Sequence, residues 1–394
     1  MKKYLKTAAV IAAAAVLSGC RQISELPAEQ DSAELPQAGS VSIIYEDSDS
    51  ADEENTVGKY VYEQLSDKEK IYYDGLKKAA EEYAASYEYP DDVDQDTARK
   101  IFAAVYNQEP QLFWLDSIFY PPNENVQLLK YRFDRERTEQ MQSEIDSVCA
   151  DIDAQTEGMS VYDKLLFFHD SIVRGCTFSM DDEYSSTVYG ALCGGFAQCE
   201  GYAFTYKYLC DRAGIDCMTV TGTNSSGSTH AWNIVDLNGI WYNVDCTWDD
   251  PILDPVNTDF LRRYYFLVPD SDILNISHFR NEEYFTYPKC YDSGRTYFAA
   301  EGFLAKSSSD GIDKLKKSAV EALSQGHYDA EVRFERKSDY TAAQTALFDL
   351  GDIRRLINSA AEEAGVSGQV TAARSKRYKN DELYIIHITM AHSE

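Results

Sequence analysis

Long apolar runs are missing from this sequence after its first twenty residues, so no later segment is predicted to span a membrane. Basic residues are scarce as well: 37 Lys and Arg stand against 66 Asp and Glu, for a formal net charge of −29. A surface of this sign repels phosphate backbones, so we expect no nucleic-acid partner.

Cysteine is sparse, and its spacing carries no metal signature. Nine Cys in 394 residues are too few for a disulfide-dense scaffold, and none shows the paired CxxC spacing of a zinc site. Asp249, Asp250 and Asp254 lack the ligand pattern and glycine of an EF-hand loop, so a solvated acidic turn is expected there. We therefore predict no metal and no cofactor.

The chain does have ample apolar material. It is 44% hydrophobic and 13% aromatic, which supports a sizeable core and, at this length, two or three domains. We divide it into a signal peptide (1–20), an acidic flexible linker (21–58), an N-terminal α+β region (59–158), a central domain (159–306) and a small C-terminal α+β domain (308–394).

The first twenty residues have the features of a secretory signal. A basic start precedes an Ala-rich apolar run, and small residues precede Cys20. The sequence Leu-Ser-Gly-Cys resembles the lipobox of bacterial lipoproteins, which implies cleavage before Cys20 and a lipid on its sulfur. An ordinary signal peptide is the alternative. Residues 21–58 hold ten acidic residues against one Arg, which predicts a self-repelling spacer. The expected location is the bacterial cell envelope, lipid-anchored and extracytoplasmic.

Apolar periodicity and turn residues predict the elements around the centre. Helices are expected over 59–85, 96–106, 135–155 and 160–174, and strands over 111–116, 117–120 and 126–133. After a Ser-rich linker at 307–311, we expect helices over 312–325 and 342–365 and strands over 328–335, 369–379 and 382–390.

Cys199 opens a predicted helix that runs to Asp211, just after a loop containing Gly194 and Gly195. The unpaired N–H groups and the dipole at a helix N-terminus favour negative charge. A cysteine held there is biased toward the thiolate, which is its nucleophilic form.

Two strands flank Asn238-Gly239, the strongest short signal for a hairpin. With a two-residue turn, His230 pairs with Thr247, and Asp245 becomes its diagonal neighbour on the same sheet face. The imidazole is then within reach of the carboxylate, provided that no bulge shifts the register.

A nucleophilic Cys, a His base and an Asp that orients the His make up the thiol version of a catalytic triad. For the oxyanion, the backbone N–H of Cys199 and the side chain of Gln198 are candidates. Trp232, Trp248 and Tyr202 are candidates for lining a substrate groove, and packing in the aromatic core is the alternative. His169 is expected to be a core or surface histidine rather than a ligand.

Four blocks resemble the bacterial transglutaminase-like superfamily across about 160–270: Thr187–Leu192, Cys199–Ala203, Thr229–Asn233 and Trp241–Pro251. The resemblance implies a papain-like α+β core, in which a helix bearing the Cys packs on an antiparallel sheet bearing His and Asp. It also implies Cys199 as nucleophile, His230 as base, Asp245 as orienter and a thioester acyl-enzyme. Gln198 before the nucleophile and Cys246 beside Asp245 depart from the usual pattern.

The expected function is cysteine-nucleophile acyl transfer or hydrolysis on amide or peptide substrates, with proteins, peptides or cell-wall peptides as partners besides the membrane. A cysteine peptidase is one alternative. A non-catalytic surface binding module on the same fold is the other, since a fold alone does not settle activity.

Overall fold

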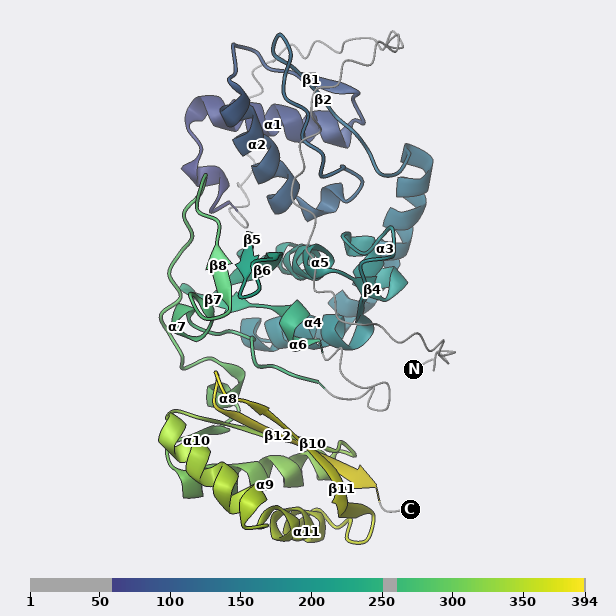
Figure 1. Cartoon of the computed structure of the whole chain (residues 1–394). Coiled ribbons are helices and arrows are strands. Elements are labelled where there is room, and N and C mark those ends of the chain that lie inside the picture. Colours follow the sequence, from purple (N-terminus) through teal and green to yellow (C-terminus); the bar gives the residue numbers. More distant parts are fainter. Residues whose placement is uncertain (1–58, 251–260, 393–394) are drawn as a thin grey trace.

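The computed structural model describes residues 59–250 and 261–392, with only the backbone of 371–379 and of 392. The predictions for Cys20, for the linker 21–58 and for Asp254 lie outside these residues. Figure 1 shows three parts in sequence along the molecule: an N-terminal helical part, a central part built on a sheet, and a C-terminal α+β unit. Across the described residues, no helix joins the length and the apolar character that crossing a bilayer requires.

The N-terminal part is mostly helical. Its elements are η1 (Tyr62–Gln64), α1 (Asp67–Glu81), β1 (Ser86–Glu88), α2 (Gln95–Gln108), η2 (Pro110–Leu112), β2 (Val126–Leu128) and α3 (Arg135–Thr156). The predicted helix over 59–85 is shorter than expected because Ser66 and Glu69 form a capping box that starts α1. The predicted strands over 111–116 and 117–120 are wrong, since Pro110 begins a 3₁₀ turn there and Leu115 forms only an isolated bridge, with Tyr131. Of the strand expected over 126–133, residues 126–128 pair with β1.

The central part holds most of the sequence blocks singled out above. Its elements are α4 (Val161–Gly175), β3 (Thr177–Phe178), η3 (Gly190–Gly194), β4 (Phe196–Ala197), α5 (Cys199–Arg212), β5 (Cys217–Asn224), β6 (Thr229–Leu237), β7 (Ile240–Val244), α6 (Cys246–Asp249), α7 (Asp270–Ile273), β8 (His278–Arg280) and α8 (Tyr297–Ala300). Strands β7-β6-β5-β8 form one sheet, and all its pairs are antiparallel. The fold class is therefore α+β, with a cysteine-bearing helix against an antiparallel sheet, as predicted.

Helix α5 is the buried centre of this part. Residues 199–210 are all buried, and Asn233 on β6 donates its side-chain N–H to the Ala203 carbonyl of α5 at 3.0 Å. Gly201 is required for the close packing, because a Cβ there would lie 2.1 Å from the Ser185 carbonyl oxygen. These contacts fix the start of α5 relative to the sheet.

One core joins the N-terminal and central parts. Buried residues of α1, α2, α3, α4 and α5 belong to a single hydrophobic cluster. In addition, Gln108 of α2 bonds both backbone groups of Thr219 on β5: its Nε2 donates to the carbonyl at 2.8 Å, and its Oε1 accepts from the N–H at 3.2 Å. The amide side chain thus takes the place that a neighbouring strand would occupy.

The C-terminal unit has its own core. Its elements are β9 (Leu304–Ala305), α9 (Ser308–Ser324), β10 (Asp329–Phe334), α10 (Lys337–Gln344), η4 (Thr345–Asp349), α11 (Ile353–Glu363), β11 (Val370–Asn380) and β12 (Ile385–His392), with sheet order β11-β12-β10-β9. The predicted linker at 307–311 is instead the start of α9, because Ser307 caps the helix by accepting from Asp310 N. The predicted helix over 342–365 is broken by η4 and Gly351.

The turn of the C-terminal hairpin packs on the central sheet. Leu383 and Ile385 belong to the same buried cluster as Met218, Trp232 and Ile234 of β5 and β6. In Figure 1 the β11–β12 hairpin, drawn in yellow, points its turn toward the central part. The C-terminal unit therefore supports the sheet that carries His230.

Candidate active site

Cys199 is the first residue of α5, as predicted, with Gln198 as the N-cap. The residue is 2% exposed, and α5 packs against β6, the strand that carries His230. It begins a 14-residue helix, so the positive end of the helix dipole lies at this residue.

His230 and Asp245 are in direct contact. His230 Nε2 lies 2.6 Å from Asp245 Oδ2, and both side chains are buried. The pairing of Leu237 with Ile240 confirms the predicted hairpin register. The bonding distance between imidazole and carboxylate therefore agrees with the geometry expected from the sequence.

The predicted pairing of His230 with Thr247 is wrong, however. Strand β7 ends at Val244, and His230 pairs with Gly222 on β5 instead. The chain turns because the Asp245 carboxylate caps α6, with Oδ1 accepting from Trp248 N at 3.0 Å, and this places Thr247 inside the helix. Asp245 reaches the histidine from the end of its strand.

A second histidine, His278 on β8, also contacts the carboxylate. Its Nε2 lies 2.8 Å from Asp245 Oδ2, and its Nδ1 lies 2.8 Å from Ser277 Oγ. Burial by itself raises the pKa of the Asp245 carboxyl, but His230 and His278 together bring it below its usual value. Burial also lowers the pKa of His278.

Sequence reasoning missed His278. It lies 33 residues beyond Asp245 in a three-residue edge strand, and the sequence around it matches no catalytic pattern. The only signal was the presence of a histidine in an apolar stretch.

The side chains of His230, Asp245 and His278 also offer possible metal-ligand atoms, which all lie within 4.8 Å of one another. A metal ion can bind at such a spacing. Two ligands about 2 Å from a tetrahedral ion are roughly 3.3 Å apart. The contacts of 2.6 and 2.8 Å are shorter and match charge-assisted hydrogen bonds. We therefore assign hydrogen bonds here, not metal ligation.

Two of the three aromatic groove candidates are core residues. Trp232 is fully buried and donates Nε1–H to Asn243 at 3.2 Å. Tyr202 is buried too, and its hydroxyl donates to the Asp250 carboxylate. Trp248 is half-buried, and its ring lies 5.9 Å from that of His230 and 4.7 Å from that of His278. Of these candidates, only Trp248 is partly exposed.

Gln198 is engaged with its neighbour. The residue is buried, and its Nε2 donates to the Glu200 carboxylate at 3.3 Å. Both sequence-based candidates for the oxyanion, the Gln198 side chain and the Cys199 N–H, thus lie at the start of α5.

A cavity of about 420 Å³ opens beside His230. It lies between α2 and the β5–β8 edge of the sheet, and Glu200, next to Cys199, lines it as well. Arg99 and Asn107 come from α2, while Phe279 comes from β8. The N-terminal part thus forms one wall of the space that adjoins the histidine.

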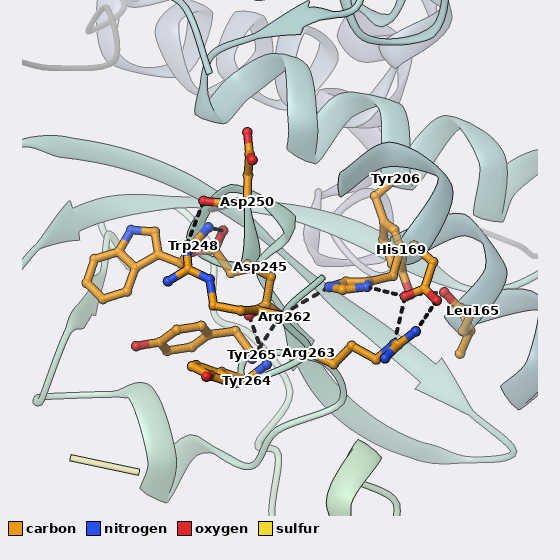
Figure 2. Close-up of polar contacts among 12 residues, drawn as sticks. Leu165, His169, Tyr206, Asp245, Trp248, Asp250, Arg262, Arg263, Tyr264 and Tyr265 are labelled. Atoms are coloured by element: carbon orange, nitrogen blue, oxygen red, sulfur yellow. Dashed lines mark hydrogen bonds and ion pairs between the residues drawn. The ribbon is translucent and has the colours of Figure 1, made fainter. Parts of the chain in front are cut away.

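A third buried histidine, His169, is hydrogen-bonded to two carboxylates near the site. His169 Nε2 lies 3.1 Å from Asp249 Oδ2, and its Nδ1 lies 3.1 Å from Asp170 Oδ1, which also pairs with Arg263. Figure 2 shows His169 and Arg263 meeting in this network. Burial lowers the pKa of His169, but Asp170 and Asp249 outweigh it and raise the value. His169 is a core histidine, in line with the sequence-based expectation.

The expected solvated turn at Asp249 and Asp250 is wrong, because both residues are buried. Asp249 accepts from the backbone N–H groups of Tyr264 and Tyr265, at 2.8 and 3.0 Å. The backbone carbonyl of Asp250 accepts from Arg262 at 2.8 Å (Figure 2). The Asp250 carboxylate accepts from the Phe178 N–H at 3.1 Å, so both carboxylates have backbone donors in place of water.

Comparisons with known proteins give a local likeness. A stretch of 83 residues is 39% identical to the Kyphoscoliosis peptidase of Homo sapiens and 37% identical to that of Mus musculus, covering 18% of this chain and 13% of each relative's length. The chain thus spans far less than two thirds of these relatives. No protein-family model matches the chain.

Two solved structures align over parts of the chain. One is a TGase, at 16% identity and a TM-score of 0.26, covering 41% of this chain and 50% of the other. The other is a candidate cysteine protease from Cytophaga hutchinsonii, at 19% identity and a TM-score of 0.25, covering 30% and 45%. At such scores neither alignment supports a conclusion about activity.

Proposed function

We propose that the protein is a cysteine-nucleophile enzyme that cleaves amide or peptide bonds, or transfers their acyl group, through a thioester. The observation that carries this proposal is the hydrogen bond between His230 and Asp245, with His230 on a strand packed against the helix that Cys199 opens. The cavity lined by His230 supplies a space for the substrate.

The chemistry follows from the ring nitrogens of His230. Nε2 is bonded to Asp245, which leaves Nδ1 as the nitrogen that receives the thiol proton. The thiolate attacks the carbonyl carbon and forms the C–S bond. The C–N bond then breaks, and the imidazolium gives its proton to the departing amine or ammonia.

The second half of the reaction regenerates the thiol. Water or a second amine attacks the thioester and loses its proton to His230, and the C–S bond breaks. Water yields hydrolysis, and a lysine amine yields a cross-link. Which of them wins depends on how well the site excludes water. Hydrolysis is the second candidate function within this proposal. It is supported by the local likeness to a protein named as a peptidase, Kyphoscoliosis peptidase.

The substrates proposed are proteins or peptides, including cell-wall peptides, because the sequence predicts an extracytoplasmic chain held at a membrane by a lipid on Cys20. Full recovery of the native protein without detergent would argue against this anchor.

The test compares wild type with Cys199→Ala and with Cys193→Ala, a half-buried cysteine six positions earlier, as the matched control. Dansyl-cadaverine incorporation into a glutamine-containing protein measures transfer, and cleavage of a peptide library measures hydrolysis, both under reductant. Cys199→Ala should lose activity at least 1,000-fold, since no other group replaces the nucleophile, while Cys193→Ala should stay within about threefold. Equal activity of wild type and Cys199→Ala would rule out Cys199 as the nucleophile, and a wild type without either activity would favour the binding-module alternative.

A further inference from the structure

We propose that His278 is a positioning residue that holds the Asp245 carboxylate in the orientation needed to fix His230. This inference rests on the proposed cysteine-enzyme function. It assigns a fourth side chain to a site that the sequence described with three.

The carboxylate of Asp245 receives three N–H donors from three separate elements. Oδ2 accepts from His230 on β6 and from His278 on β8, and Oδ1 accepts from the backbone of Trp248 in α6. A carboxylate with donors on both oxygens cannot rotate without losing a bond. Without His278, the only contact left on Oδ2 would be the one to His230, so nothing independent of that ring would hold this oxygen in place.

This arrangement determines which ring nitrogens of His230 and His278 carry a proton. An ionised carboxylate only accepts, so both ring nitrogens that face Asp245 must carry a proton. His278 then presents an unprotonated Nδ1, which accepts from the Ser277 hydroxyl at 2.8 Å. The same rule leaves the Nδ1 of His230 as the acceptor for the thiol proton. Ser277, His278 and Asp245 therefore form a chain that sets the tautomer of His230.

His278 is not itself a base for the substrate. The residue is 0% exposed and does not line the cavity beside His230. Its ring is enclosed by Trp232, Trp248 and Tyr265, with centroids 5.0, 4.7 and 5.9 Å away. An apolar side chain would pack in such a place at lower cost than an imidazole. The imidazole is accounted for by its bond to Asp245.

The experiment compares His278→Gln with His278→Leu. A Gln side chain can present an N–H near the place of Nε2, whereas Leu keeps comparable bulk without a donor. With the substrate found for wild type, His278→Leu should lower kcat at least tenfold with KM changed less than threefold. His278→Gln should recover kcat to within about threefold of wild type. A Leu variant with wild-type kcat, or a Gln variant as slow as a folded Leu variant, overturns the proposal.

A second measurement covers a Leu variant that fails to fold. In ¹⁵N-histidine-labelled wild type, the His278 imidazole should appear as a neutral ring protonated at Nε2 with a downfield proton, and His278→Gln should remove that signal. A His278 protonated at Nδ1 overturns the proposal. These spectra need no substrate, so they test the positioning of Asp245 even if amide cleavage by Cys199 is refuted.

Discussion

At the residue scale, the site depends on the number of acceptors that Asp245 offers. Asn has one side-chain acceptor oxygen where Asp245 uses two, so in Asp245→Asn an NH₂ group must face a ring N–H or the Trp248 N–H. A donor left unpaired in a buried site costs about 1–3 kcal/mol.

We therefore expect Asp245→Asn to lower kcat/KM by about 100-fold or more and to lower Tm as well. Steady-state kinetics and thermal unfolding by circular dichroism measure the two effects. Asp292→Asn is the control, since its carboxylate accepts from Tyr242 away from the histidines. A fully active Asp245→Asn would mean that the carboxylate charge does not support His230.

Some residues of the site could be predicted from sequence, and the reasons are local. The position of Cys199 at a helix start could be predicted because neighbouring residues determine where a helix begins. The contact between His230 and Asp245 could be predicted because the Asn238-Gly239 turn fixes the register of the hairpin. His278 could not be found, because its contact depends on the distant edge pairing of β8 with β5. The burial of Asp249 escaped prediction for a similar reason: its partners are backbone groups 15 and 16 residues away.

At the scale of elements, the edge strand β8 is held close to β5 by a glycine. A Cβ on Gly222 would lie 2.0 Å from the Phe279 carbonyl oxygen, a backbone atom that cannot move without moving the strand. Since His278 precedes Phe279 on β8, Gly222→Ala should push His278 away from Asp245.

The expected result for Gly222→Ala is a kcat loss close to that of His278→Leu, together with a destabilisation of about 1–3 kcal/mol. Urea unfolding and turnover check it. Gly175→Ala, at the end of α4 with open space around its Cβ, is the matched control and should leave both unchanged. Unchanged turnover in a folded Gly222→Ala would show that β8 tolerates displacement.

Strand predictions failed where local pattern and tertiary packing disagreed. The segment 111–120 has the short apolar runs of a buried strand, but Leu112 and Phe113 lie in and just after the 3₁₀ turn that Pro110 begins, and both are buried in the N-terminal core. By contrast, α3 and α4 match their expected ranges because an amphipathic helix meets the core along a single stripe.

At the scale of the whole molecule, a buried carboxyl lies where the C-terminal unit faces the central part. Glu331 on β10 lies 3.6 Å from His387 Nδ1, which is bonded to Tyr264 of the central part. Burial raises the pKa of Glu331 to about 8, with Asp249, Asp329 and Asp170 adding to the rise and Arg263 opposing it.

The sign of the resulting pH dependence follows from proton binding. Below about pH 4.5 Glu331 is protonated in both the folded and the unfolded chain. Between there and about pH 8 the unfolded chain has lost the proton that the folded chain keeps, so stability falls as pH rises and then levels off.

Glu331→Gln removes this titration while keeping the shape. Its Tm should approach that of wild type near pH 5 and exceed it increasingly up to about pH 8, by several degrees. Thermal unfolding of both proteins at pH 5, 6.5, 8 and 9 measures the difference between their Tm values. The contributions of other titrating groups cancel in this difference because both proteins contain them. Two parallel Tm curves would mean that Glu331 titrates normally in the folded chain.

The amide of Gln108 has a consequence for solubility. Exposed strand edges recruit other chains through their unpaired N–H and C=O groups, and proteins commonly protect them with charge, proline or a bulge. Here a side chain of α2 occupies both groups of Thr219, so this stretch of β5 offers no template for an incoming strand. If α2 unfolded, the N–H and C=O groups of Thr219 on β5 would be exposed to pairing with a strand of another chain. Self-association would then compete with refolding.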